Sequence, residues 1–351
     1  MKQNYLLPFL PPFAFLSAVL ISFLPFNAFS TVILQYHHVS STTAPITSIS
    51  TEMFKQHMQH LKDQQFTVIA LPLLIEKIRQ KQPLEDKTAV ITFDDGYSNV
   101  YDNARPILKQ FDWPYTVFIN PQFVDGGYKK HMNWTQLRQI ASEKATIANH
   151  TMNHDYLVRT PDGLSQTQWL LKIKQDITLA EQRISKEIGQ QHKMVAYPYG
   201  EFNLTIQKML RDNGFVGIGQ HSGAAGAHTD LTRVPRFPAS GFYANLKTLK
   251  TKIASLPMPI TALTNADPVF GQNPPTLSIT AKTADFSPRN LQCFFSGSNR
   301  ATVKWTADDT FTVTAPDQLP QGRSRYNCTA PSKSKAGRFY WFSQPWVNAD
   351  K

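Results

Sequence analysis

Cysteine is scarce in this chain: its 351 residues include only Cys293 and Cys328, and both lie near the C-terminal end. The long segment before them therefore cannot contain a cysteine nucleophile or a thiolate-bound metal. Two cysteines are enough for one disulfide, which would persist if the protein were exported to an oxidising compartment.

The sequence also lacks motifs that mark several common functional classes. It contains no glycine-rich phosphate loop, no Gly-x-Ser-x-Gly nucleophile elbow and no internal repeat. Lysine and arginine outnumber aspartate and glutamate by 36 to 25, which gives a formal net charge of +11. The charges are dispersed and no nucleic-acid-binding motif accompanies them, so we expect no nucleic-acid partner. A basic exported protein is better suited to acidic envelope polymers.

The N-terminal segment has almost no charged side chains: Lys2 is the only one before Glu52. Residues 6–24 form an apolar stretch that is followed by a small-x-small cleavage pattern, Ala28-Phe29-Ser30. We expect a signal peptide at residues 1–30, so that the mature protein is secreted, periplasmic or held in the cell envelope without a stable membrane span. The alternative is an uncleaved anchor, because the stretch approaches the ~20 residues that span a bilayer. Three prolines within it disfavour a regular helix.

Short β-rich segments alternate with helical patterns up to about residue 256. The clearest helix is predicted at 166–187, where apolar residues recur every three or four positions and Gly189 provides a stop. This alternation indicates an α/β fold with a parallel sheet, and seven strands predict a distorted seven-stranded (β/α) barrel, with an open flavodoxin-like sheet as the alternative. The predicted strands are 32–35, 89–93, 115–119, 146–149, 194–197, 215–218 and 232–236.

The composition changes beyond residue 256. Five prolines punctuate residues 257–275, which we interpret as a linker, and the later segments are short and rich in threonine, valine and aromatics. We therefore predict an α/β domain at 31–256 and a small all-β domain at 276–351. The aromatic residues of the second domain either fill its core or stack on sugar rings; they are Tyr340, Trp341, Phe342 and Trp346.

Two adjacent carboxylates, Asp94 and Asp95, follow the apolar segment Thr88–Phe93, and Gly96 permits a sharp exit from that strand. Ligands and catalytic groups of α/β folds gather at the carboxyl ends of strands. An Asp-Asp pair alone is equally typical of a turn or a helix N-cap. The functional interpretation therefore depends on a second motif.

The predicted strand at 146–149 ends in the same manner, on His150 and His154. Two imidazoles four residues apart can converge on one ion, and a carboxylate from a neighbouring strand would complete a three-ligand site with a position open for water. Histidines with this spacing are common on protein surfaces, but their pairing with a strand that ends on two aspartates favours a metal site. A third strand ends on Pro198, Tyr199 and Gly200, where proline fixes the backbone and a main-chain N–H can point at a ligand.

The ordered motifs Thr92-Phe93-Asp94-Asp95-Gly96, His150-Thr151-Met152-Asn153-His154 and Tyr197-Pro198-Tyr199-Gly200 resemble the polysaccharide deacetylase family, also called carbohydrate esterase family 4 or the NodB-homology domain. The opening segment with Tyr36, His37 and Val39 is similar to the YHxV segment of many members. The resemblance covers roughly residues 32–255. The Ala-Tyr-Pro-Tyr-Gly form of the third motif resembles the branch of poly-β-1,6-N-acetylglucosamine deacetylases.

The resemblance implies a role for each motif residue. Asp94 would be the general base, and Asp95, His150 and His154 would bind a divalent metal, with Zn²⁺ as the ion we expect. The main-chain N–H of Tyr199 would share the developing oxyanion. The implied reaction is hydrolysis of the N-acetyl groups of an amino-sugar polysaccharide to free amine and acetate. The alternatives are an O-acetyl carbohydrate esterase and a non-catalytic glycan-binding protein.

Two departures from the family pattern leave roles open. Ala196 stands where many members have an arginine that accompanies the base, and Arg233 or Arg236 would have to substitute. The late Leu-x-His motif that often supplies the general acid has no clear match. His221 is the best-placed candidate for that acid, with His228 second, while His37 and His38 are alternatives that would line the site. The sequence leaves the oligomeric state open.

Overall fold

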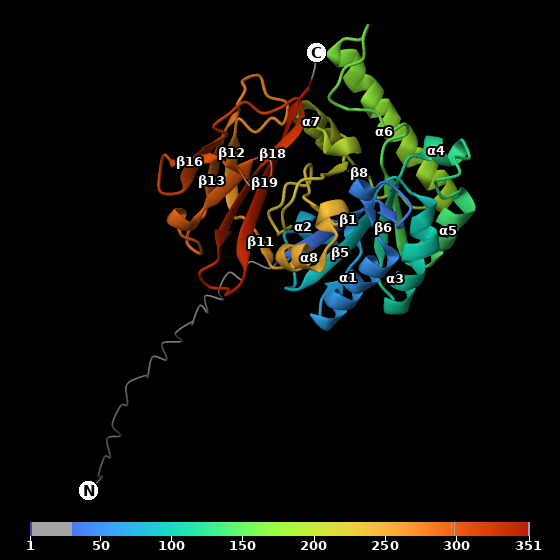
Figure 1. Ribbon diagram of the computed structural model, residues 1–351, viewed down its shortest axis with the longest axis horizontal. Coiled ribbons are helices and arrows are strands. Elements are labelled where there is room, and N and C mark those ends of the chain that lie inside the picture. The colour runs from blue at the N-terminus through green and yellow to red at the C-terminus, as the bar shows by residue number, and fades with distance from the viewer. Residues whose placement is uncertain (2–29, 296, 298, 350–351) are drawn as a thin grey trace.

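The computed structural model describes Met1 and residues 30–349 apart from 296 and 298 (Figure 1). The expected signal peptide, residues 1–30, thus falls almost wholly outside the described residues. None of the helices within the described part has both the length and the apolar character needed to cross a membrane.

The α/β domain is built on an eight-stranded sheet in which every pairing is parallel. The strand order is β10-β1-β5-β6-β7-β8-β9, with the short β4 beside β5. This arrangement confirms the distorted, barrel-like α/β fold. The strands are β1 Thr31–Tyr36, β4 Thr67–Val68, β5 Thr88–Phe93, β6 Tyr115–Ile119, β7 Ala145–Asn149, β8 Met194–Ala196, β9 Val216–Ile218 and β10 Phe237–Pro238. A separate two-stranded pair joins β2 His38–Val39 to β3 Ser48–Ile49.

The last predicted strand, 232–236, is displaced. The regular strand β10 begins at Phe237, and within 232–236 only Val234 forms a bridge, to Ile218 of β9. Pro235 interrupts the segment because it has no N–H to give to a ladder. The same stretch of chain nonetheless contacts β9 through Val234 and β1 through β10, so it links the two ends of the sheet.

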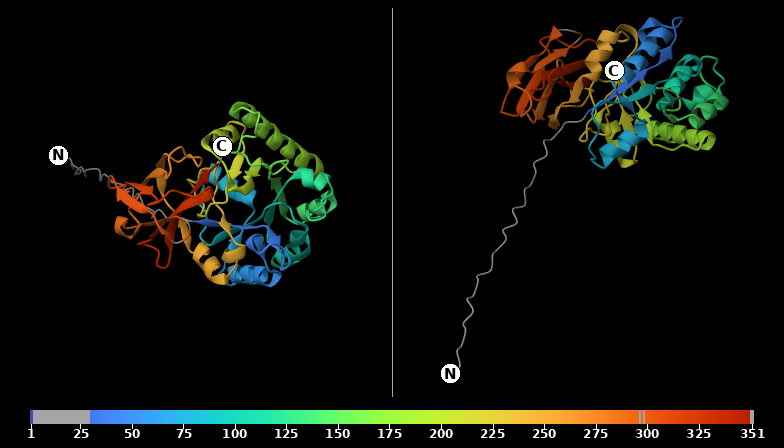
Figure 2. Two further views of the ribbon diagram at one scale, coloured as in Figure 1. Left: turned by 45° about the horizontal axis from the view of Figure 1, so that its top comes forward. Right: turned by 90° about the horizontal axis from the view of Figure 1, so that it is seen from below.

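Helices cover the outside of this sheet (Figure 2). The longest, α6, spans Gln166–Ile188, begins with a capping box at Ser165 and ends at Gly189 in the left-handed conformation, as its sequence predicts. Its buried face includes Ile173, Ile177 and Ile184. The other helices are α1 Thr51–Asp63, α2 Leu71–Arg79, α3 Arg105–Phe111, α4 Pro121–Asp125, α5 Trp134–Ser142, α7 Leu204–Asp212 and α8 Leu246–Ile253.

The C-terminal part folds as two β-sheets beside the α/β domain (Figure 1). Their strand orders are β11-β19-β18-β14-β15 and β12-β13-β17-β16. The expected linker, 257–275, contains β12, which pairs with β13, so this proline-rich segment supplies a strand to the second sheet. The strands are β11 Ser255–Pro257, β12 Ile260–Thr264, β13 Thr276–Ala281, β14 Gln292–Phe295, β15 Asn299–Arg300, β16 Thr302–Trp305, β17 Thr310–Thr314, β18 Gly322–Pro331 and β19 Phe339–Asn348.

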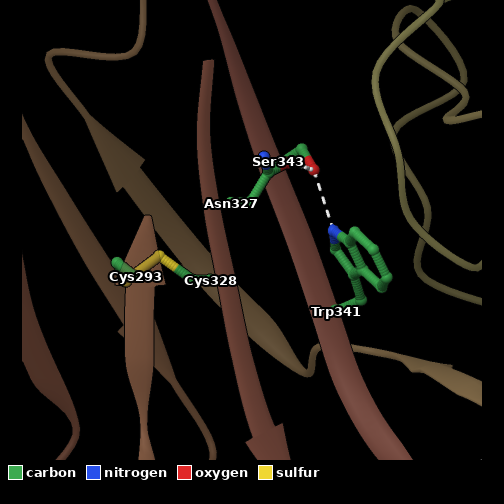
Figure 3. Close-up of a disulfide and its surroundings, with 5 residues drawn as sticks. All are labelled: Cys293, Asn327, Cys328, Trp341 and Ser343. Carbon is green, nitrogen blue, oxygen red and sulfur yellow. Dashed lines mark hydrogen bonds between the residues drawn. A yellow bond between two sulfur atoms is a disulfide. The ribbon is translucent and has the colours of Figure 1, made fainter. Parts of the chain in front are cut away.

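The aromatic residues of β19 mostly fill hydrophobic cores. Tyr340 and Trp346 are buried in the core of the β domain. Trp341 lies on the side of β19 that faces the α/β domain, where its ring packs edge-on against Phe237 and its Nε1 donates to Ser343 (Figure 3). Phe342 is partly buried against the β-domain core. The packing interpretation of these aromatics therefore accounts for their positions better than sugar stacking does.

The two cysteines form the expected disulfide, which joins β14 to β18 (Figure 3). Cys293 and Cys328 are paired directly across the strands. On the chain-entropy account, the bridge closes a loop that constrains the unfolded chain and adds roughly 3–4 kcal/mol of stability. A Cys293→Ala, Cys328→Ala variant should lose about that much unfolding free energy in denaturant titrations at equal slope. A loss of the same size in the wild type after reduction is the matched control, and no change in either would contradict the account.

Arginines join the two domains. Arg338, directly before β19, donates to both carboxylate oxygens of Asp86, each at 3.1 Å, and to Ser30 Oγ at 2.8 Å. Arg233 of the α/β domain is buried and donates to Gln344 Oε1 of β19 at 3.0 Å. The β domain is therefore packed closely on the α/β domain through charged and apolar contacts.

Candidate active site

The Asp94-Asp95 turn lies at the carboxyl end of β5, as predicted. The N–H of Asp94 bonds to the carbonyl of Tyr36 at the end of β1, and Asp95 and Gly96 both adopt left-handed backbone conformations. A Cβ on Gly96 would lie 2.8 Å from a side-chain carbon of Ile119, so only glycine fits this turn. The turn directs the two carboxylates to different partners.

The loop that carries the two histidines follows β7, whose carboxyl end lies at the same edge of the sheet as the carboxyl end of β5. Asn149 Oδ1 accepts from the N–H of Thr151, and Asp176 of α6 accepts from the N–H of Met152. Thr151 and His154 have positive φ values of 66° and 61°, which folds the loop back so that both imidazoles point toward β5. The loop is therefore shaped by side chains that stand outside the histidine motif itself.

Asp95, His150 and His154 come together as one group whose ligand atoms all lie within 4.8 Å of one another. Asp95 Oδ1 is 3.3 Å from His150 Nε2 and 3.4 Å from His154 Nε2. His150 Nδ1 donates to the carbonyl of Ala196, and its buried Nε2 has no hydrogen-bond partner among the described residues. Burial raises the pKa of Asp95, but the two imidazoles outweigh it and hold that pKa well below its usual value. One carboxylate and two oriented imidazoles fit a divalent ion.

Asp94 is fully buried and is held by the cation that the sequence left undecided. Arg236 makes a bidentate pair with it, Nη1 to Oδ1 at 2.6 Å and Nη2 to Oδ2 at 2.8 Å, and Gln35 Nε2 donates to Oδ2 at 2.7 Å. Burial raises the pKa of Asp94, but Arg236, His150 and His37 outweigh it and lower the pKa to about 2. Asp94 is therefore ionised at neutral pH. Arg236 provides the positive charge beside Asp94 that the alanine at position 196 cannot provide.

Removing the charge of Arg236 should expose the cost of a buried, unpaired carboxylate. We expect Arg236→Gln to lower the unfolding free energy by about 3–5 kcal/mol and to reduce activity sharply. Chemical denaturation and acetate release measure the two effects. Arg211→Gln, at an exposed position on α7, is the control and should change neither; an unaltered Arg236→Gln protein would contradict the assignment.

Tyr199 lies in a single 3₁₀ turn, Pro198–Gly200, with φ 59° and ψ 0°. Its ring stacks on Tyr156 with centroids 3.9 Å apart and meets the His154 ring edge-on at 4.6 Å. Its carbonyl accepts a 2.6 Å hydrogen bond from Arg323 Nη1 of β18. The β domain thus holds the backbone of the third motif beside the metal ligands, a contact that no local sequence signal indicates.

The histidine candidates for the general acid occupy different places. His221 is buried, approaches Phe202 and lines a cavity between the two domains, and no contact joins it to Asp94 or to the metal-ligand group within the described residues. His37 Nε2 lies 3.9 Å from Asp94 Oδ2, with its side chain 19% exposed. His38 stacks on Tyr97, centroids 3.6 Å apart. Of the four candidates, His37 is the one placed against the predicted base; His228 is exposed.

Sequence reasoning missed Gln35 and Tyr97. Gln35, on β1, supplies the third donor to Asp94. Tyr97 directly follows the Asp-Asp-Gly turn, and burial followed by the charge of Asp95 raises its pKa. Gln35 directly precedes the segment with Tyr36 and His37, and Tyr97 directly follows the Asp94-Asp95-Gly96 motif. This adjacency is the sequence signal that could have indicated both residues.

The protein is therefore a barrel-like α/β protein with a candidate single-metal centre. A carboxylate and two imidazoles form this centre at the strand ends, and an ionised aspartate lies beside them. The polysaccharide deacetylase family model matches residues 81–218, which include all three strand-end motifs, and this segment of the chain belongs to that family.

Several relatives are known by name. The YxkH protein of Bacillus subtilis is 26% identical over 225 residues, covering 62% of this chain and 76% of its own length. A poly-β-1,6-N-acetyl-D-glucosamine N-deacetylase of Escherichia coli K12 is 24% identical over 250 residues, covering 60% of this chain but only 36% of its own length. Among solved structures, the Streptococcus pyogenes deacetylase PplD in complex with acetate aligns with a TM-score of 0.58 and 20% identity, covering 65% of this chain and 99% of PplD. That likeness concerns the fold.

Proposed function

We propose that this protein is a metal-dependent deacetylase that hydrolyses N-acetyl groups of an amino-sugar polysaccharide to free amine and acetate. The observation that carries the proposal is the placement of a buried, ionised Asp94 directly beside the Asp95–His150–His154 group. The family membership and the relatives named as N-acetylglucosamine polymer deacetylases support a poly-N-acetylglucosamine or chitin-like substrate.

The proposed chemistry divides between the two aspartates. A divalent ion, which we propose is zinc, would supply an acidified water and polarise an acyl oxygen. Asp94 receives the proton of the attacking water. Its two oxygens offer about four acceptor positions, of which Arg236 and Gln35 occupy three. One acceptor position therefore remains for the proton of the attacking water. The donors from Arg236 and Gln35 hold the carboxylate in place during that proton transfer.

The other roles concern the acyl oxygen and the departing amine. We propose that the main-chain N–H of Tyr199 donates to the developing oxyanion, a role suited to a backbone held in a fixed left-handed turn. The amine must gain a proton, and His221 is the acid that the sequence favours. Burial holds the pKa of His221 well below its usual value, which leaves the ring neutral and counts against that role. The nearness of His37 to Asp94 makes it the competing acid. Whichever of His221→Asn and His37→Asn flattens the alkaline limb of the pH–rate profile identifies the acid.

The test of the proposed function is acetate release from a panel of polymers. Purified protein loaded with zinc is offered chitin oligomers, poly-β-1,6-N-acetylglucosamine, peptidoglycan and O-acetylated xylan, and both acetate and new amine are measured. Equal amounts of acetate and amine from an amino-sugar polymer support the proposal. Acetate from xylan alone would favour the O-acetyl esterase, and binding without release would favour a glycan-binding protein.

We also propose that the protein works outside the cytoplasm. The disulfide between its only two cysteines supports export, because such bonds persist in oxidising compartments. The native metal and the oligomeric assembly are open to direct measurement by elemental analysis and light scattering. Mass spectrometry of the protein from its host should give an N-terminus at Thr31, and an intact Met1 would contradict cleavage.

A further inference from the structure

A cavity of about 510 Å³ lies between the α/β domain and the β domain. Its α/β wall includes Tyr156, Tyr199 and Glu201, and its other wall includes Arg323 and Arg325 of β18. The volume falls in the range of ~300–1,000 Å³ typical of ligand pockets. Neither arginine belongs to residues 81–218, the segment matched by the family model, so this wall is provided by the β domain and not by the family segment.

The cavity carries an excess of positive charge. Three arginines line it, Arg159, Arg323 and Arg325, against one carboxylate, Glu201. Glu201 is fully buried and already accepts from Arg159 Nη2 at 2.9 Å and Nε at 3.2 Å, and Arg323 Nε lies 4.0 Å away. Arg325 forms no ion pair with any residue that the structure describes. Arg159 and Arg323 therefore share one carboxylate, and the guanidinium of Arg325 has none among the described residues.

Buried polar atoms of the lining also lack partners. Among the described residues, Ser324 Oγ, Trp346 Nε1 and His221 Nδ1 are buried and make no hydrogen bond, and all three residues line the cavity. Trp346 and His221 are 1% and 5% exposed. Burial and then the charge of Arg233 hold the pKa of His221 well below its usual value, so its ring is neutral. Unpartnered polar groups beside an excess of positive charge are typical of a site that receives a polar, anionic ligand.

The cavity adjoins the metal-ligand group through Tyr199. The ring of this residue contacts His154, while its carbonyl accepts from Arg323, so one residue borders both places. A glycan bound across the first site can therefore extend into the cavity by its neighbouring sugar. The lining combines polar and charged side chains with aromatic rings, which suits a hydroxylated sugar better than a wholly apolar ligand.

We propose that the cavity binds a carboxylate-bearing sugar of the glycan whose N-acetyl group is presented to Asp94 and the metal-ligand group. Arg325 is the principal partner of the carboxylate, with Arg323 beside it. The planar guanidinium matches a carboxylate in two parallel hydrogen bonds. This inference rests on the proposed function for the identity of the neighbouring sugar, and it predicts that amino-sugar polymers that also carry acidic sugars bind more tightly than neutral ones.

The experiment measures binding, which needs no turnover. Calorimetry with the full chain compares a tetrasaccharide of alternating N-acetylglucosamine and glucuronic acid with a neutral N-acetylglucosamine tetramer. We expect the acidic tetrasaccharide to bind at least about tenfold more tightly at low salt, as one charged hydrogen-bonded pair would provide, with the difference shrinking as salt is added. Loss of deacetylation in a separate assay would overturn the proposed function while leaving this comparison valid.

Variants locate the effect. Arg325→Gln should reduce the preference for the acidic ligand about tenfold. Arg325→Lys should retain only part of it, because an ammonium group keeps the charge but not the two parallel hydrogen bonds. Arg300→Gln, on exposed β15 of the same domain, should leave the preference unchanged. Thermal unfolding confirms that the three variants are equally folded. Equal binding of the two ligands by the wild type, or an Arg325→Gln protein that keeps the full preference, would overturn the proposal.

Discussion

A His150→Ala, His154→Ala protein is expected to bind no divalent metal and to release no acetate. The two imidazoles provide two of the three ligand atoms gathered at Asp95, and a single carboxylate holds a transition metal weakly. Elemental analysis after dialysis against zinc measures the metal, and acetate release measures activity. We expect both to fall to background, a loss of several orders of magnitude in activity.

His60→Ala is the control for this variant, because His60 lies on the outer helix α1 and not among the metal-ligand group. It should retain stoichiometric metal and full activity. Retention of one metal per chain by the double variant would show that the ion binds elsewhere.

An Asp94→Asn protein is expected to keep its metal and to lose turnover by roughly 10²–10⁴-fold. Asparagine preserves the shape of the side chain, but it cannot accept the proton of the attacking water. The substitution also leaves Arg236 without its carboxylate, so a thermal unfolding measurement accompanies the kinetics. The expected outcome is a folded, metal-loaded and nearly inactive protein.

The control for Asp94→Asn is Asp63→Asn, at an exposed position on α1. It should match the wild type in metal content and rate. If Asp94→Asn instead loses its metal while remaining folded, the two adjacent carboxylates have the opposite roles.

Much of the site was predictable because its residues follow strands directly. Asp95, His150 and His154 each come just after a buried strand, and the parallel sheet brings those ends together. Helix α6 was predictable because its apolar period, its Ser165 cap and its terminal glycine agree. Local chemistry determines these features, so a local pattern reveals them.

Other features depend on contacts between distant segments. Arg236 reaches Asp94 across 142 positions, and the sequence alone offered it only as one of two arginines. Arg323 reaches Tyr199 across 124 positions, from a domain whose packing no motif specifies. The proline-rich segment 257–275 was interpreted as a linker because proline disfavours strands, yet β12 lies between its prolines and pairs with β13.

The central claim is that Asp95, His150 and His154 hold the metal with which Asp94 hydrolyses an N-acetyl group. The most direct measurement follows acetate and free amine released from poly-β-1,6-N-acetylglucosamine by one preparation before chelation, after chelation and after zinc is restored. The account predicts equal acetate and amine from the loaded protein, none from the chelated protein, and recovery in proportion to zinc up to one ion per chain. Undiminished release from a protein shown to be free of metal would contradict it.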